Sequence, residues 1–199
     1  MKSDASLGVQ GSVFRFAFDD TVFAVDAAKA GRIAEFSLGG RNILTSAQTP
    51  EQNNWGSTFW PSQQGDWGWP PPAELDPGAY TPQVSKGSLL VSSAVAPGLG
   101  LAVSKRFSVD VARGAVHVEY GIVNRGSQPR SVAPWEISRV SSGGLTFFPM
   151  GEGQPWKGPQ ELLTLQIADG VAWLASENTP APNDQKVLPV ALCQPNRSV

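Results

Sequence analysis

The chain has 199 residues, of which 41% are hydrophobic and only 16% are charged, and its formal net charge is −2. This length is typical of one domain or two small ones and is enough to bury a core. A near-neutral charge without a cluster of lysines and arginines argues against nucleic-acid binding and against a basic membrane anchor. The 21 glycines and 17 prolines indicate many turns, which favours an all-β chain.

The number of cysteines and the N-terminal residues indicate the cellular compartment that we expect for this chain. A single cysteine, Cys193, excludes an internal disulfide framework. The opening residues, MKSDASLGVQGSVF, lack the apolar run of a signal peptide, and no apolar segment is long enough to cross a bilayer as a helix. The sequence therefore predicts a cytoplasmic chain without membrane contact, with a processed exported form as the alternative. No zinc spacing and no phosphate-loop motif is found, so neither metal nor cofactor is expected.

Apolar and polar residues alternate with a period of two along most of the chain, as in strands with one buried face. The first such segments are SVFRFAF (12–18), TVFAVDA (21–27), RIAEFSL (32–38) and RNILTS (41–46). The later ones are GSLLVSSAVA (87–96), LAVSKRFSVDV (101–111), AVHVEYGIVN (115–124), SVAPWEISRV (131–140) and LTFFP (145–149). Turn residues recur about every ten positions, so the sequence predicts an antiparallel β-sandwich or barrel.

The alternation weakens beyond Pro149. Residues 151–159 are expected to form a loop, and TLQIADGVAWLAS (164–176) to form two short strands around Asp169-Gly170. From residue 177 the chain is polar and broken by prolines, with one short apolar run. The predicted organisation is one β domain over residues 1–176 and a loosely attached tail over 177–199.

Residues 53–72, NNWGSTFWPSQQGDWGWPPP, hold four of the seven tryptophans beside prolines and glycines. Glycine and proline indicate a loop, whereas tryptophan usually anchors a core or a binding surface. A sugar ring stacks its apolar face on an indole and bonds its hydroxyls to amides, carboxylates and arginines. The segment therefore predicts a carbohydrate site, the alternative being that its tryptophans cap one end of the core. The candidate ligand-binding residues here are Asn54, Trp55, Trp60, Gln63, Asp66, Trp67 and Trp69.

A second group of candidates lies in APWEISRV, residues 133–140. In a strand, Trp135, Ile137 and Arg139 point to one face, and Glu136 and Ser138 point to the other. Trp135 and Arg139 are added to the candidate ligand-binding residues, and Glu136 is the candidate catalytic acid or base. The alternative is an ordinary salt bridge on a solvated strand face.

The only histidine, His117, lies in AVHVEYGIVN. We expect it on the polar face of a half-exposed strand, beside Glu119 and opposite Val116, Val118 and Tyr120. A role as acid or base would require that this polar face line the cleft.

Three segments, taken in order, resemble galactose mutarotase-like domains. AGRIAEFSLGGRNIL resembles their opening strand and hairpin, and NNWGSTFWPSQQGDWGW stands where hexose-6-phosphate mutarotases carry a Gly-rich loop with Trp-Pro. KRFSVDVARGAVHVEYGIVNRGSQP resembles their pair of strands that ends in an Asn before a turn. WGSTFWPS, WGWPPP and PWEISRV with GGLTFFP are closest to an uncharacterised bacterial family within this superfamily. The resemblance covers Phe14 to Pro149 and implies a large antiparallel supersandwich with a cleft for a small-molecule sugar.

The resemblance also implies aldose mutarotation, in which a late Glu is the base and a His after the Asn turn is the acid. This sequence departs from that pattern, because PRSVAPWEISRV holds no histidine and nothing after Trp173 resembles the late segment. We therefore expect a carbohydrate-binding domain without the usual acid–base pair, and a sandwich that lacks final strands. One alternative is an aldose 1-epimerase-like isomerase using Glu136 with Asp66 or His117. The other is a structural or interaction module in which the aromatic segment packs on a partner chain, and self-association through an exposed sheet edge would fit it.

Overall fold

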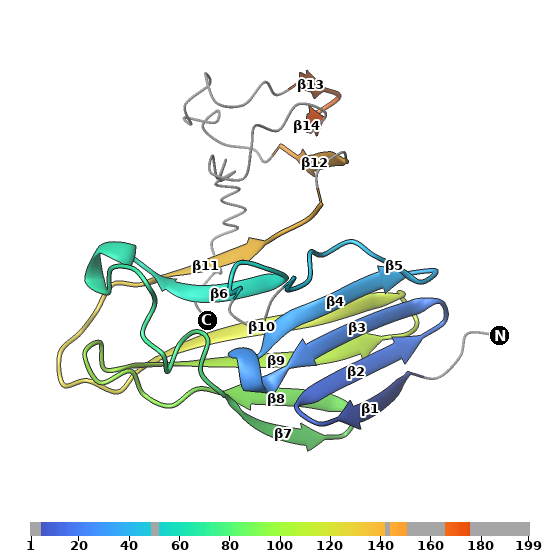
Figure 1. Ribbon diagram of the computed structural model, residues 1–199. Coiled ribbons are helices and arrows are strands. Elements are labelled where there is room, and N and C mark those ends of the chain that lie inside the picture. The colour runs from blue at the N-terminus through green and yellow to red at the C-terminus, as the bar shows by residue number, and fades with distance from the viewer. Residues whose placement is uncertain (1–4, 49–51, 142–143, 151–165, 176–199) are drawn as a thin grey trace. The chain divides into compact units, whose positions relative to one another are not determined.

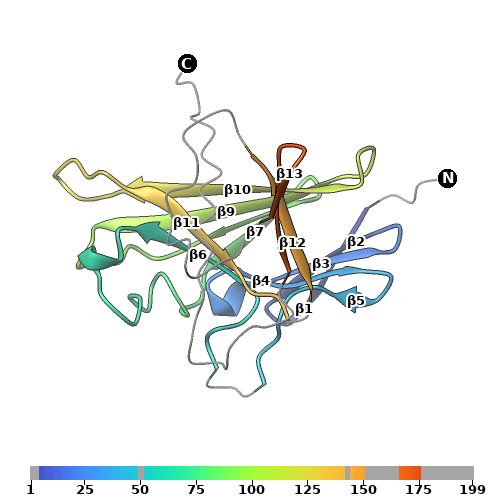
Figure 2. The same cartoon turned by 90° about the horizontal axis from the view of Figure 1, so that it is seen from above.

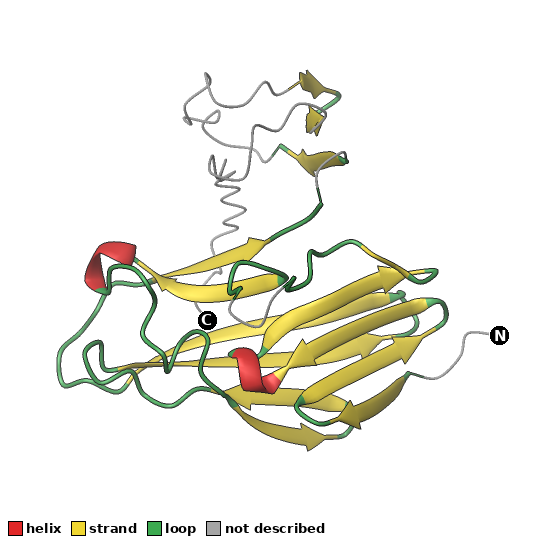
Figure 3. Cartoon of the chain, in the orientation of Figure 1, coloured by secondary structure: helices red, strands yellow, loops and turns green. Residues whose placement is uncertain are grey.

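The computed structural model describes residues 5–48, 52–141, 144–150 and 166–175. Contacts between Cα atoms divide the chain into two compact units, Met1–Val140 and Ser141–Val199. The boundary predicted between residues 176 and 177 lies at the edge of the described part and stays a prediction. Within the described ranges the helices are two short 3-10 turns, shown in Figure 3, and no helix is long and apolar enough to cross a membrane.

The first unit contains a seven-stranded antiparallel sheet in the order β1-β2-β3-β4-β6-β11, with β5 paired to β4 (Figure 1). Its strands are β1 (Ser6–Gln10), β2 (Val13–Phe18), β3 (Thr21–Asp26), β4 (Arg32–Leu38), β5 (Arg41–Asn42), β6 (Ser57–Ser62) and β11 (Ala133–Ser138). The 3-10 turn η1 (Ala27–Lys29) joins β3 to β4, and Asp26 caps it by accepting a hydrogen bond from the Ala28 amide. The alternating segments predicted at 12–18, 21–27 and 32–38 are therefore confirmed as strands, whereas the segment predicted at 41–46 forms a strand only over residues 41–42.

The same unit contains a second antiparallel sheet in the order β10-β9-β8-β7. Its strands are β7 (Thr81–Ser85), β8 (Ser88–Ser92), β9 (Leu101–Asp110) and β10 (Ala115–Asn124). β9 and β10 pair along their whole length, from Leu101 opposite Asn124 to Asp110 opposite Ala115. The predicted strands 101–111 and 115–124 are confirmed almost to the residue.

The two sheets face each other (Figures 1 and 2) and share one hydrophobic core. Phe16 and Phe23 from the first sheet and Val91 and Phe107 from the second are each at most 2% exposed. The rings of Phe23 and Phe107 lie 5.7 Å apart between centroids, so the sheets touch through aromatic side chains. The apolar face that alternation places on each sheet is buried against the other sheet.

Residues 57–62 form a strand, so the prediction of a continuous loop over 53–72 is wrong at β6. Five of its six residues are buried, from Ser57 to Pro61. Because both faces of β6 are covered, its sequence shows no alternation and resembles a Trp-Pro loop. Gly56 leads into the strand with a φ of +60°, where a Cβ would collide with the Ile33 carbonyl oxygen.

Strands β1 and β7 were also not predicted from the sequence. All five residues of β7 are exposed, as are four of the five in β1. Each pairs along one side only, at the edge of its sheet. Edge strands with little burial carry no apolar alternation, which explains why the sequence gives no signal there.

The second unit contains three described strands, β12 (Leu145–Pro149), β13 (Gln166–Ala168) and β14 (Val171–Ala175), in the order β12-β14-β13. The rings of Phe147 and Trp173 lie 5.1 Å apart across the β12–β14 pair. The short strands predicted around Asp169-Gly170 are confirmed as β13 and β14. The predicted loop 151–159 and tail 177–199 lie outside the described residues.

Replacing Phe107 by Ala should destabilise the first unit by about 3–5 kcal/mol, because it leaves a cavity where the two sheets touch. Val84→Ala is the control, since Val84 on β7 is 53% exposed and should cost less than about 0.5 kcal/mol. Urea denaturation measures both changes. Equal losses for the two variants would contradict a shared core centred on Phe107.

Candidate functional site

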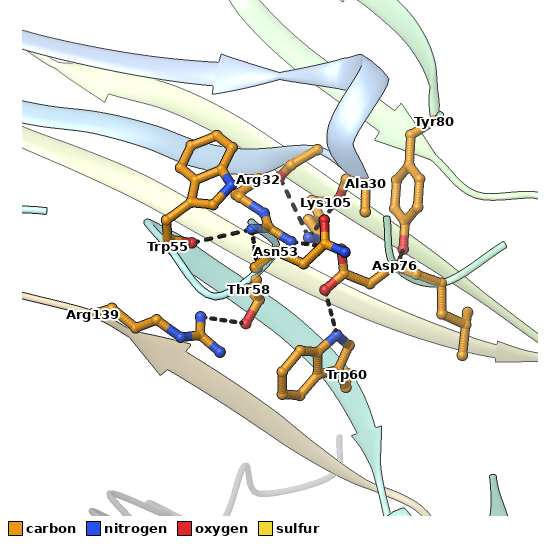
Figure 4. Close-up of polar contacts among 12 residues, drawn as sticks. Ala30, Arg32, Asn53, Trp55, Thr58, Trp60, Asp76, Tyr80, Lys105 and Arg139 are labelled. Atoms are coloured by element: carbon orange, nitrogen blue, oxygen red, sulfur yellow. Dashed lines mark hydrogen bonds and ion pairs between the residues drawn. The ribbon is translucent and has the colours of Figure 1, made fainter. Parts of the chain in front are cut away.

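A buried ion pair lies at the base of the tryptophan-rich segment (Figure 4). Arg32, on β4, is 1% exposed, and its Nη2 lies 2.7 Å from Oδ1 of Asp76. The other terminal nitrogen of Arg32 donates to the main-chain oxygens of Asn53 and Trp55. One guanidinium therefore fastens residues 53–55, at the start of the segment, and residue 76, just beyond its end, to the same strand.

Aromatic groups complete the surroundings of this ion pair. Oδ2 of Asp76 accepts a hydrogen bond of 3.0 Å from Nε1 of Trp60. The Arg32 guanidinium lies over the Trp55 ring, 4.8 Å from its centroid. Trp55 and Trp60 are only 8% and 3% exposed. Breaking a buried ion pair costs about 3–5 kcal/mol, since it leaves an uncompensated charge.

Lys105 is a second buried cation beside this ion pair. It points from β9 into the core, is 2% exposed, and donates from Nζ to the carbonyl oxygens of Ala30 (2.7 Å) and Gly31 (3.3 Å). Burial lowers the pKa of Lys105 to about 7, although the charge of Asp76 acts in the opposite direction. Burial, and then the charge of Asp76, raises the pKa of Tyr80 above its ordinary value. The Tyr80 hydroxyl donates to the Leu75 carbonyl oxygen at 3.0 Å.

Trp60 is the centre of a tryptophan cluster, by which we mean Trp60, Trp67, Trp69 and Trp135. The other three ring centroids lie 5.4 Å (Trp135), 6.0 Å (Trp69) and 6.1 Å (Trp67) from that of Trp60, all at steep interplanar angles. Nε1 of Trp67 donates to the Pro61 carbonyl oxygen at 3.0 Å. Trp67 and Trp135 are half-buried, whereas Trp69 is 58% exposed. Solvent exposure within the cluster therefore increases from the buried Trp60, through the half-buried Trp67 and Trp135, to the exposed Trp69.

The polar candidate residues differ in their partners and in their exposure to solvent. Asp66, in the 3-10 turn η2 (Gln64–Asp66) that leads to Trp67, forms an ion pair of 3.6 Å with Arg130. Nη1 of Arg139 donates to Oγ1 of Thr58 at 3.1 Å, and its guanidinium lies 5.8 Å from the Trp60 centroid. Burial, and then the charge of Arg32, lowers the pKa of Arg139. Asn54 and Gln63 are exposed.

Two of the predicted stacking residues are corrected by this geometry. The sequence placed Trp55 and Trp60 on a sugar-binding surface beside Trp67 and Trp69. Both are buried, Trp55 against Arg32 and Trp60 under the other three indoles, so neither offers an open face to a sugar. The alternative prediction, that tryptophans of this segment cover the core, fits these two and also Trp67, which packs partly buried against the core.

Glu136 lies on the opposite face of β11 from the tryptophan cluster. In the β6–β11 ladder Trp135 stands opposite Trp60, and Glu136 stands opposite Phe59. The Phe59 ring stacks on Tyr120 of β10 with centroids 4.1 Å apart, so this face looks toward the second sheet. The predicted split of side chains along residues 135–139 is therefore confirmed, and it separates Glu136 from the indoles.

The acid–base pairs considered for an epimerase are not brought together. Oε1 of Glu136 accepts hydrogen bonds from Oγ of Ser57 (2.5 Å) and Ser138 (3.2 Å). Asp66 pairs with Arg130 instead, and Nε2 of His117 lies 3.9 Å from Asp110. The His117 side chain is 58% exposed while Val116 and Val118 pack on the core, which confirms the predicted polar face.

Comparison of the chain with protein-family models, with curated proteins and with solved structures gave no match. Among the described residues, no group of three or more His, Cys, Asp or Glu side chains could hold a metal ion. The buried charges Arg32, Asp76 and Lys105 were not predicted from the sequence. Of these three residues, only the burial of Lys105 could have been recognised from the sequence, because Lys105 occupies an inward position between Val103 and Phe107 in an alternating strand.

The free energy of unfolding should rise with pH between about 7 and 9.5. Folded Lys105 loses its proton near pH 7, whereas the unfolded side chain keeps it to about 10.5. The unfolded chain therefore binds more protons in this range, and stability gains up to ~1.4 kcal/mol per pH unit. Above about pH 10 the slope should reverse, since burial-raised pKa values keep Tyr80 and Tyr120 protonated only in the folded state.

Chemical denaturation at a series of pH values measures this profile. The control is Lys105→Met, which removes the titrating group and should flatten the rise between pH 7 and 9.5. A flat wild-type profile, or the same rise in a folded Lys105→Met variant, would show that Lys105 is not the group responsible.

Proposed function

We propose that the first unit is a β-sandwich of the galactose mutarotase-like kind that binds a carbohydrate on the tryptophan cluster and does not catalyse anomer exchange. Two facing antiparallel sheets with one core support the sandwich. The observation that carries the binding site is Trp69, 58% exposed and packed at 83° against the buried Trp60. The family assignment rests on the resemblance of residues 14–149.

The cluster offers the two kinds of contact that a sugar requires. Trp69, with the half-buried Trp67 and Trp135 packed around the same indole, provides apolar ring surface for the C–H face of a pyranose. Asp66, next to Trp67 in the sequence, and its ion-pair partner Arg130 supply a carboxylate and a guanidinium, with side chains 45% and 35% exposed. Such mixed aromatic and charged surfaces suit ligands with one apolar face and many hydroxyls.

The expected affinity is modest. By analogy with aromatic pairs, each stack contributes roughly 0.5–1.5 kcal/mol, and each net hydrogen bond contributes about 1 kcal/mol. Two stacks and a few hydrogen bonds give about −4 kcal/mol, which corresponds to a millimolar Kd. Hydrogen bonds of Trp60 to Asp76 and of Trp67 to Pro61 fix two indoles beforehand, so binding orders few side chains.

An aldose 1-epimerase-like activity is the less favoured function. It would need an acid and a base at hydrogen-bond distance from one sugar. Glu136 lies across β11 from Trp135, and Asp66 and His117 have partners elsewhere. A sugar stacked on the cluster would therefore not reach Glu136.

A self-associating module is the other candidate, and the sheet edges favour it. β11 ends the strand order of the first sheet and β10 ends that of the second. Val132 and Val140, which flank β11, are 37% and 54% exposed. Light scattering that shows a dimer, together with no sugar binding, would favour this function over the carbohydrate site.

Saturation-transfer NMR against hexoses, hexose phosphates and uronic acids should detect binding of at least one sugar. Trp69→Ala should weaken it about 2- to 10-fold, because one stack of roughly 0.5–1.5 kcal/mol is lost. Phe147→Ala is the control, since Phe147 is 61% exposed but belongs to the second unit.

The same sample reports on catalysis through the anomeric protons. The proposal requires that sugar signals show binding without faster anomer exchange. Accelerated exchange that Glu136→Gln abolishes would favour the epimerase, and sugar binding that survives Trp69→Ala unchanged would reject the proposed surface.

A further inference from the structure

A separate pocket of about 220 Å³ opens on the inner face of the β6–β11 pair, away from the tryptophan cluster. Its apolar walls include Phe23 and Phe36 from the first sheet and Val116 and Val118 from the second. The rings of Phe23 and Phe36 meet edge to face, 5.7 Å apart at 80°. Phe36 is 38% exposed, so the pocket has an aromatic wall that reaches solvent.

The polar end of this pocket consists of Glu136, Ser57 and Ser138. Both serine hydroxyls donate to the same carboxylate oxygen, Oε1 of Glu136. Burial, and then the charge of Glu136, raises the pKa of Tyr120 on the neighbouring strand β10. The two serine hydroxyls orient this carboxylate but carry no positive charge, and the pocket lining holds no lysine or arginine to pair with it.

No ion pair among the described residues includes Glu136. The charge of Glu136 acts on the buried Lys105 and favours its protonated form. The Lys105 ammonium does not pair with Glu136 but donates hydrogen bonds to the carbonyl oxygens of Ala30 and Gly31. Since burial lowers the pKa of Lys105 to about 7, this compensation is only partial at neutral pH. An oriented carboxylate at one end of an apolar, partly open pocket is complementary to an organic cation.

We propose that this pocket binds a small amine whose ammonium group meets the Glu136 carboxylate and whose apolar body lies between Phe36 and Val116. A cavity of about 150 Å³ is sufficient for benzene, so one aromatic ring with a short ammonium arm fits the pocket. The apolar walls offer no partners for a sugar's many hydroxyls, and the carboxylate repels anions. This site is independent of the carbohydrate surface, because it lies on the other side of β6 and β11.

Benzylamine, benzyl alcohol and benzoate are matched probes for this site, since they share one ring and differ in charge. Titration at neutral pH, followed by protein NMR shifts, should give benzylamine a Kd at least tenfold below that of benzyl alcohol. Benzoate should not bind. If benzylamine and benzyl alcohol bind the wild-type protein with equal affinity, the proposal is wrong, and no variant is needed to show this.

Glu136→Gln should remove the tenfold preference for the amine, and Phe36→Ala should weaken the amine and the alcohol alike. Glu119→Gln is the control for charge, because the Glu119 side chain on β10 is 78% exposed and pairs with Arg106. Trp69→Ala is the control for location and should leave amine binding unchanged. Amine binding that survives Glu136→Gln, or that disappears in Trp69→Ala, would overturn the proposal.

Discussion

The buried contact between Arg32 and Asp76 is the constraint on which the tryptophan-rich segment depends. A single guanidinium binds main-chain oxygens at residues 53 and 55 and the carboxylate at residue 76, so the segment between them is closed into a loop at its base. The same carboxylate receives the Trp60 indole. Since desolvation of the two charges offsets much of their attraction, we infer that the ion pair positions the aromatic cluster more than it adds net stability.

Strand alternation then divides the β6–β11 pair into two chemically different faces. Trp60 and Trp135 stand on one face, and Phe59 and Glu136 stand on the other. The first face carries the exposed indole surface proposed for sugars, and the second carries the acidic, apolar pocket proposed for amines. This division is the physical reason for proposing binding without catalysis, because a sugar on the indoles is screened from Glu136 by the backbone of both strands.

Much of the fold could be predicted from the sequence, but the centre of the site could not. Alternation identified β2, β3, β4, β9 and β10, and in β2 and β9 it corresponds directly to one buried and one more exposed face. β6 was missed because it is covered on both sides. The burial of Trp55 and Trp60 depends on charges 23 and 16 residues away, which no local pattern connects to them. The exposed Trp69 and the opposed orientations of Trp135 and Glu136 are local properties, and these could be read from the residues.

Residue-resolved NMR of the tryptophan indole N–H signals during a sugar titration tests the carbohydrate surface most directly. The signal of Trp55 is the internal reference, since this indole is buried against Arg32. The account predicts that the Trp69 signal shifts most, with smaller shifts for Trp67 and Trp135 and almost none for Trp55. Shifts confined to Trp173 in the second unit, or no indole shift with a sugar that demonstrably binds, would contradict the account.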